Sequence, residues 1–275
     1  MTSITPLVLT LLSSEQINYY ERTYNQYESL IFSLLLVLVA IFISRKEKLS
    51  LEKDIIWSTA RAIIQLFIVG YVLTYIFDVD HIILTFLMVL FICYNAAYNA
   101  KKRSKYVKDI FIISFVAITT GALLTLSILL FTHAIAFTPI QIIPITGMIA
   151  GNAMIATGLC YNQLGQRFEN HQQQIQEMLS LGATPKIASM AIIRDSIKSS
   201  LIPTVDAAKT VGIVSLPGMM SGLIFAGVDP LQAVKYQIMV TFMLMATASI
   251  STIIACYLTY KKFFNQRHQL MTFNQ

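Results

Sequence analysis

The residues that could do chemistry in this chain are few, and they stand at helical spacings. Asp206 and Lys209 are three residues apart, so one helix face can carry both and let them pair. Further along, Pro217 and Gly218 interrupt an apolar run. A broken helix leaves backbone carbonyls that, in a membrane, only protein or a watery cavity can satisfy. This pattern predicts a pore-lining helix, with a boundary ion pair and a simple packing kink as the alternatives.

Polar side chains on other apolar segments extend this candidate path. Arg61 and Gln65 stand one helical turn apart, and Asn95 and Asn99 repeat that spacing. Arg61 has the alternative of reaching lipid phosphates at the membrane surface. The candidate path residues are Arg61, Gln65, Asn95, Asn152, Asp206, Lys209, Pro217 and Gly218.

Gly147 and Gly151 form a GxxxG pattern beside Asn152 in GMIAGNAMIATGLC. Small residues at this spacing let two membrane helices approach closely. The pattern therefore predicts helix packing, and a role in a transport path is the equal alternative.

Met219 and Met220 follow the predicted break and are the weak candidates for binding a metal ion. Thioethers prefer soft ions such as copper(I), whereas iron(II) favours oxygen and nitrogen ligands. Methionine is also an ordinary filler of apolar helix interfaces. We therefore expect packing here and predict no metal-ligand set.

Enzyme motifs are absent from the sequence. It contains no GxxxxGK[ST], so it has no phosphate-cradling P-loop, and it contains neither HExxH nor GxSxG. Its three cysteines lie singly in apolar runs, which indicates no disulfide framework and no zinc site. We expect a protein that is not an enzyme and that binds no cofactor itself.

The composition is that of an integral membrane protein. Of the 275 residues, 56% are hydrophobic and only 12% are charged, about half the charged fraction of a soluble domain. Seven segments are apolar and long enough to span a bilayer. The predicted spans are 28–44, 60–77, 81–100, 109–131, 139–161, 211–228 and 237–259. The fold expected is all-α, and the sixth span is short and interrupted by Pro217.

Basic residues set the orientation of these spans, because cytosolic loops are enriched in lysine and arginine. With seven spans, sixteen of the twenty basic residues fall on one side. They are Arg45, Lys46, Lys48, Lys53, Lys101, Lys102, Arg103, Lys105, Lys108, Arg167, Lys186, Arg194, Lys198, Lys261, Lys262 and Arg267. This predicts an external N-terminus and a cytosolic C-terminus in the cell membrane.

One long cytosolic connection, residues 162–210, is predicted to form a helix–turn–helix element. Its first part, QRFENHQQQIQEMLSL, is polar and helix-forming, and Gly182 marks the turn. Thr184 can then cap a second helix whose first residue is Pro185. We accordingly divide the chain into an extracellular segment 1–27, a transmembrane domain 28–260 and a cytosolic tail 261–275.

Four stretches resemble the iron-export permease family of ABC transporters, whose bacterial members are called FetB and whose plant relatives are linked to aluminium tolerance. They are ARAIIQLFIVGYVL (60–73), GMIAGNAMIATGL (147–159), LSLGATP (179–185) and the run from Ser200 to Ile238. The run contains VGIVSLPGMMSG and AGVDP, the most specific part, and the resemblance covers roughly residues 50–260.

The resemblance implies a permease without its own ATPase, paired with a second permease and served by a separate subunit that binds ATP and magnesium. EMLSLGATPKIA is similar to the loop of ABC importer permeases that docks on the ATPase. Glu177 and Gly182 are five residues apart here, one fewer than is usual in the importers. The coupling residues implied are Glu177, Leu181, Gly182, Ala183, Thr184 and Pro185.

Two other classes of function stay open at this point. The first is an ATP-independent channel or carrier, and the second is a membrane scaffold whose segment 162–210 binds another cytosolic protein. Within the ABC class, another metal or a nucleotide sugar is the alternative cargo. Lipid is an expected neighbour in every case, and no nucleic-acid partner is expected.

Overall fold

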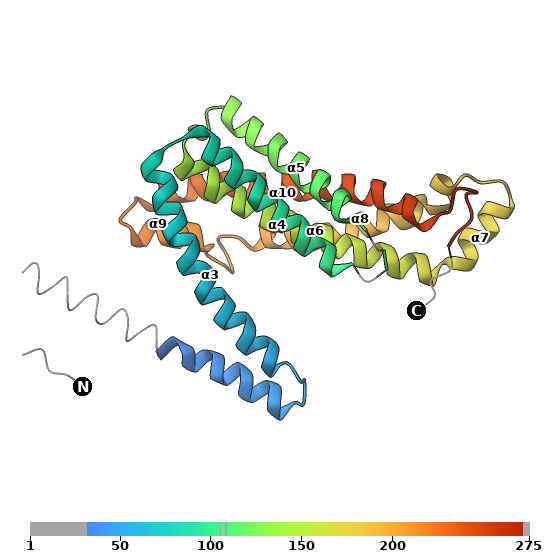
Figure 1. The fold of residues 1–275 in the computed structure, drawn as a ribbon, viewed down its shortest axis with the longest axis horizontal. Helices are drawn as coiled ribbons and strands as arrows, with labels where there is room; N and C mark the ends of the chain where they lie inside the picture. The colour runs from blue at the N-terminus through green and yellow to red at the C-terminus, as the bar shows by residue number, and fades with distance from the viewer. Residues whose placement is uncertain (1–31, 105, 108, 272–275) are drawn as a thin grey trace, which may run out of the picture. The chain divides into compact units, whose positions relative to one another are not determined.

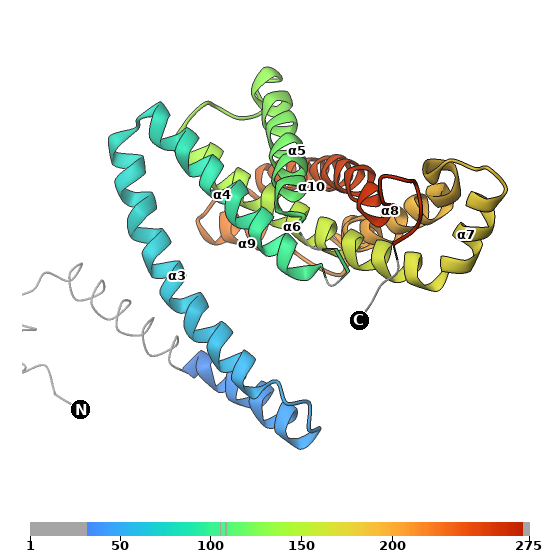
Figure 2. The ribbon, with the colours of Figure 1, turned by 45° about the vertical axis from the view of Figure 1, so that its right-hand side comes forward.

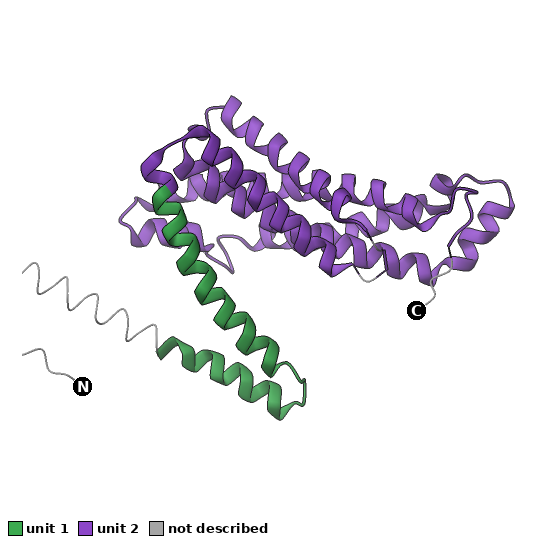
Figure 3. Cartoon of the chain, viewed as in Figure 1, with its two compact units in different colours: residues 1–75 green, residues 76–275 purple. Residues whose placement is uncertain are grey.

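The computed structural model describes residues 32–104, 106–107 and 109–271. Within these ranges the chain is all-helical, and the only β pairings are isolated bridges. It divides into two compact units, residues 1–75 and 76–275 (Figure 3). The predicted segment 1–27 lies outside the described residues.

In the first unit, residues 32–46 are helical, and a turn leads into α3 (Glu52–Val79). The turn is held by Ser44, whose hydroxyl accepts a hydrogen bond from the Leu51 amide at 3.2 Å. Nearly all of α3 is exposed and apolar around its whole circumference. A helix of this kind belongs in a membrane rather than at the surface of a soluble domain.

In the second unit, four long helices pack along one another (Figures 1 and 2). They are α4 (Ile82–Arg103), α5 (Phe111–Phe131), α6 (Pro139–Asn170) and α10 (Pro230–Thr259). Small residues fill their interface, among them the fully buried Ala97, Ala117 and Ala153. Hydroxyl groups join them as well, since Thr125 hydrogen-bonds Thr247 at 2.7 Å. Small residues and interhelical hydroxyl bonds are the usual means of association between membrane helices.

The remaining helices are α7 (Gln172–Ser180), α8 (Pro185–Thr210), α9 (Gly218–Phe225) and the short η1 (Tyr260–Phe263). The first part of α8 packs against α6 and α10, in a core that includes Phe168, Ile193 and Cys256. Both views place α7 and the last described residues at the same end of the unit, which we call the α7 end (Figures 1 and 2).

Five described helices are long and apolar enough to cross a membrane: α3, α4, α5, α6 and the continuous stretch of α10 with η1. They correspond, within two residues at the start of α4 and of α5, to the second, third, fourth, fifth and seventh predicted spans. The first predicted span, 28–44, lies partly outside the described residues.

The sixth predicted span, 211–228, is not one helix. The chain leaves α8 at Val211, turns through Gly212 with a φ of +83°, and starts α9 after Pro217. Eight residues of α9 extend roughly 12 Å, too short to cross the hydrocarbon layer alone. The break begins earlier than Pro217 because Gly212 already takes a left-handed conformation that ends a helix.

The contact of Gly121 on α5 with α10 gives a first prediction. An added Cβ would overlap the Ser251 hydroxyl and lie 3.2 Å from the Thr247 carbonyl oxygen. Gly121→Val should therefore destabilise the purified protein by about 1–3 kcal/mol, measured as a lower melting temperature. Gly151→Val is the control, because nothing lies within 4 Å of its added Cβ. Equal melting temperatures of the two variants would contradict this packing.

Candidate functional site

A cleft of about 440 Å³ lies in the second unit between α6, α8, the α8–α9 break and α10. Asn152 and Pro217, both predicted path residues, line it. Asn152 donates a hydrogen bond from its amide nitrogen to the Leu244 carbonyl oxygen at 3.1 Å. It stands about 20 Å along α6 from Pro139, within the depth of a hydrocarbon layer about 30 Å thick.

Asp206 and Lys209 form the predicted ion pair, with a distance of 2.9 Å between Oδ1 and Nζ. The pair is exposed on α8, and the two residues between its members, Ala207 and Ala208, line the cleft. No residue of α8 after Ser200 is buried. The half of α8 that carries the pair is therefore at most half-buried.

Two further predicted path residues of the second unit, Asn95 and Gly218, do not line the cleft. Arg61 and Gln65 are exposed on α3, in the first unit. Asn95 is exposed on α4 and bonds within its own helix, donating to the Phe91 carbonyl oxygen at 2.9 Å. Gly218 is exposed at the start of α9 and does not line the cleft. Sequence spacing identified these polar residues but not which of them share a surface.

Gln237 on α10 lines the cleft and was not predicted. The residue is only 6% exposed, and no described group hydrogen-bonds its Oε1 atom. Leaving such a group unpaired costs about 1–3 kcal/mol. Its sequence signal is weak, because Gln232 and Lys235 stand in the same run and nothing distinguishes Gln237 from them.

Met219 packs against the core of α5, α6 and α10, and neither Met219 nor Met220 lines the cleft. Across the described residues, no three histidine, cysteine, aspartate or glutamate side chains gather as a metal site would require. Gly147 and Gly151 have no neighbour within 4 Å of an added Cβ. The GxxxG pattern therefore makes no close helix contact in the described part of the chain.

The predicted coupling residues form the turn between α7 and α8. Gly182 has a φ of +90°, and its amide donates to the Leu179 carbonyl oxygen at 3.0 Å. The Ala183 amide donates to the Met178 carbonyl oxygen at 3.0 Å. These bonds make a Schellman motif, which requires a left-handed residue such as glycine at this position. The turn is thus a fixed structure rather than a loose loop.

This turn holds Leu181 out of the fold, with 88% of the residue exposed. Glu177, one turn earlier on α7, accepts a hydrogen bond from Gln173 at 3.0 Å. On the other side, the Thr184 hydroxyl accepts from the Ile187 amide at 3.4 Å, and Pro185 begins α8. The cap predicted at Thr184 is confirmed.

The tail after α10 also builds this surface, which the sequence did not predict. Phe263 stacks on Phe168 of α6 with 4.2 Å between ring centroids. Asn265 folds the next residues into a hook, since its Oδ1 atom accepts from the Arg267 and Gln269 amides at 2.9 Å. A groove of about 760 Å³ lies between the hook and the turn.

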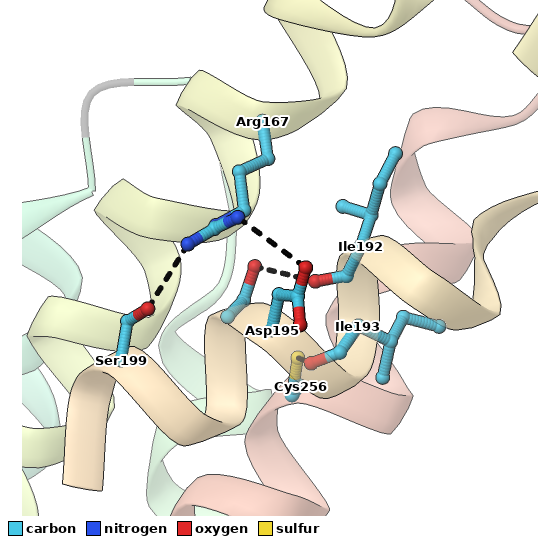
Figure 4. A network of polar contacts seen from close by, with 7 residues as sticks. Arg167, Ile192, Ile193, Asp195, Ser199 and Cys256 are labelled. Atoms are coloured by element: carbon cyan, nitrogen blue, oxygen red, sulfur yellow. Dashed lines mark hydrogen bonds and ion pairs between the residues drawn. The ribbon is translucent and has the colours of Figure 1, made fainter. Parts of the chain in front are cut away.

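Arg167 links α6 to α8 behind the turn (Figure 4). Its guanidinium donates to the Ser199 hydroxyl at 3.0 Å and lies 3.6 Å from Asp195. The Cys256 thiol of α10 donates to the Ile193 carbonyl oxygen of α8 at 3.8 Å, so α8 is joined to α10 as well (Figure 4). The α7 end is therefore joined directly to the helix that carries Asp206.

Several apolar helices long enough to cross a bilayer, joined by small residues and hydroxyl pairs, define a multi-pass helical membrane protein. The chain belongs to the family described as "Uncharacterised protein family (UPF0014)", whose model matches residues 27–264.

Two relatives show how close the family likeness is. "Probable iron export permease protein FetB" of Escherichia coli (strain K12) is 71% identical over 244 residues, covering 89% of this chain and 94% of the relative. "Protein ALUMINUM SENSITIVE 3" of Arabidopsis thaliana is 36% identical over 263 residues, covering 92% of this chain and 96% of the relative. No solved structure matches the chain. The family resemblance noted in the sequence is thereby confirmed.

Proposed function

We propose that this chain is the membrane permease of an ABC transporter that exports iron, powered by a separate ATPase subunit. The observation that carries the proposal is the 71% identity, over nearly the whole of both chains, to a protein named as a probable iron export permease. The absence of a P-loop from the sequence agrees with it, because the energy must then come from a partner. ATP and magnesium bind to that partner.

The proposed topology has seven crossings, with the N-terminus outside and the C-terminus in the cytosol. The helix containing residues 32–46 makes the first crossing, and α3, α4, α5, α6 and α10 make five more. The second half of α8 together with α9 forms an interrupted crossing. The basic residues of the loops and of the α7 end then lie in the cytosol.

The turn Leu181–Pro185, with Glu177 beside it, is the proposed docking element for the ATPase. An exposed leucine on a rigid turn offers apolar surface whose burial in a partner is favourable. Because the turn leads straight into α8, a movement of the ATPase reaches the Asp206–Lys209 pair along one helix. Two permeases, each with an ATPase, complete the proposed assembly.

Gly182 tests this coupling role. Gly182→Val places a β-branched residue at a φ of +90°, where the strain costs about 1–3 kcal/mol and distorts the turn. The variant should hydrolyse ATP without moving iron. Gly182→Asn is the control, because asparagine tolerates the left-handed region and should keep transport. Normal transport by Gly182→Val would count against a coupling role.

Inside-out membrane vesicles test the proposed function itself, because their cytosolic face is accessible to added ATP. Vesicles containing the chain and its ATPase should accumulate radiolabelled iron(II) only when ATP is supplied. Accumulation without ATP would indicate a carrier or channel instead. No accumulation of any metal would favour a scaffold or a different cargo.

A further inference from the structure

Two buried thiols meet where α6, α8 and α10 pack together. Cys160 of α6 and Cys256 of α10 are both completely buried and belong to one apolar core. Their side chains lie within hydrogen-bonding contact of each other. Cys256 also donates to the Ile193 carbonyl oxygen of α8 (Figure 4). The two sulfurs therefore face each other across the contact between α6 and α10, although the residues are far apart in the sequence.

The thiol pair lies beside the cleft and close to the end of α10. The Cys160 side chain contacts the Ser200 side chain, and both Ser200 and Leu159 line the cleft. A small molecule in the cleft therefore reaches a side chain that contacts Cys160. In the proposed topology α10 ends toward the cytosol, where thiols are kept reduced. All cysteines of the chain are free, as this compartment requires.

The third cysteine has a different environment. Cys93 is also completely buried, but it belongs to a separate core with Ala122 and Ile149. Its thiol hydrogen-bonds the Thr119 side chain rather than another sulfur. The chain thus offers one pair of adjacent thiols and one buried cysteine outside that pair.

Two adjacent thiols can be oxidised to a disulfide by a two-electron oxidant such as hydrogen peroxide. One sulfur attacks a peroxide oxygen, becomes a sulfenic acid and releases water. The second thiol then attacks the sulfenic sulfur, forms the S–S bond and releases a second water. In total the two thiols lose two electrons and two protons, and the peroxide is reduced to water. Burial slows the first step, so we expect a response to sustained oxidation.

We propose that Cys160 and Cys256 form a reversible disulfide under oxidation, which joins α6 to α10 beside the cleft. These two helices supply walls of the cleft, so the bond fixes the walls to each other. A transporter opens its path alternately to the two sides of the membrane, and the oxidised permease should therefore be arrested. The arrest rests on the proposed function, whereas the disulfide itself does not.

The first test detects the bond in the whole permease chain, held in lipid nanodiscs and treated with hydrogen peroxide. Remaining thiols are blocked with N-ethylmaleimide, and mass spectrometry of a non-reducing digest identifies linked peptides. We expect a Cys160–Cys256 peptide pair that dithiothreitol separates, with Cys93 recovered unlinked. Absence of that pair after prolonged treatment would overturn the inference and leave both cysteines as ordinary packing residues.

The second test measures the arrest in the inside-out vesicles described above. They are treated with hydrogen peroxide, and catalase removes the oxidant before iron(II) and ATP are added. The unchanged protein should lose most of its ATP-driven iron uptake, and dithiothreitol should restore it. Cys256→Ser should keep its uptake after peroxide, because its hydroxyl can still donate to the Ile193 carbonyl oxygen but forms no disulfide. Cys93→Ser is the matched control and should remain as sensitive as the unchanged protein.

Equal loss of uptake in Cys256→Ser and the unchanged protein would place the sensitive group elsewhere and overturn the proposed arrest. Untreated vesicles report separately on the proposed function. A linked Cys160–Cys256 pair in a chain that moves no iron with ATP would keep the disulfide and reject the transporter. ATP-driven uptake without any linked pair would do the reverse.

Discussion

The Leu181→Asp variant should lose the proposed ATPase subunit during purification while its melting temperature stays unchanged. Leu181 is 88% exposed on a rigid turn, so the fold gains nothing from its side chain. Burying a leucine in a partner stabilises a complex by about 1.5–3 kcal/mol, and a charge in that pocket adds a desolvation cost. We expect the dissociation constant of the permease–ATPase complex to rise about thirtyfold or more. Surface plasmon resonance, with the permease immobilised in nanodiscs, measures it.

Leu181→Met is the control for this prediction, because it keeps an apolar side chain of similar volume and should keep the ATPase bound. A complex that survives Leu181→Asp with normal affinity would place the docking surface elsewhere. The groove between the turn and the hook, lined by Arg267 and His268 on the tail side, is then the next surface to alter.

Removing one charge of the Asp206–Lys209 pair should have the second large effect. In the proposed topology the second half of α8 lies in the bilayer, and Ala207 and Ala208, the neighbours of the pair, line the cleft together with Asn152. An unpaired charge at this depth costs about 3 kcal/mol. Asp206→Asn and Lys209→Gln should therefore each reduce the amount of folded protein in the membrane strongly, measured by quantitative immunoblotting of membrane fractions.

The double variant Asp206→Asn with Lys209→Gln should recover that abundance but transport iron poorly. Asp195→Asn is the control, because its partner Arg167 lies 3.6 Å away and Asp195 is mostly exposed, so the change should cost under about 1 kcal/mol. Normal abundance of both single variants would show instead that the pair reaches bulk water at the membrane boundary.

The long helices could be predicted because hydropathy and length decide them. The predicted span 109–131 is nearly identical to Phe111–Phe131, and 81–100 falls within a few residues of Ile82–Arg103. The ends of helices were harder to predict where a helix continues beyond the apolar layer. The predicted span 139–161 stops where the chain becomes polar. The helix α6 nevertheless continues to Asn170, because a helix in water needs no apolar run.

The sites depend on neighbours that no local pattern reveals. The Asp206–Lys209 pair could be predicted from spacing on one helix, and the cap at Thr184 from its place before Pro185. Gln237 could not be predicted as a cleft residue, because the other walls of the cleft come from α6 and α8. The hook at Asn265 was also missed, although its hydrogen bonds join residues no more than four apart.

The most direct test of the central claim is ATP hydrolysis by the purified permease–ATPase complex in liposomes, with and without iron(II), manganese(II) and copper(I). An exporter permease predicts a stable complex whose hydrolysis rises with iron(II) and falls to its unstimulated rate in the Leu181→Asp variant. A chain that purifies alone, and leaves hydrolysis unchanged by every metal, would contradict the account.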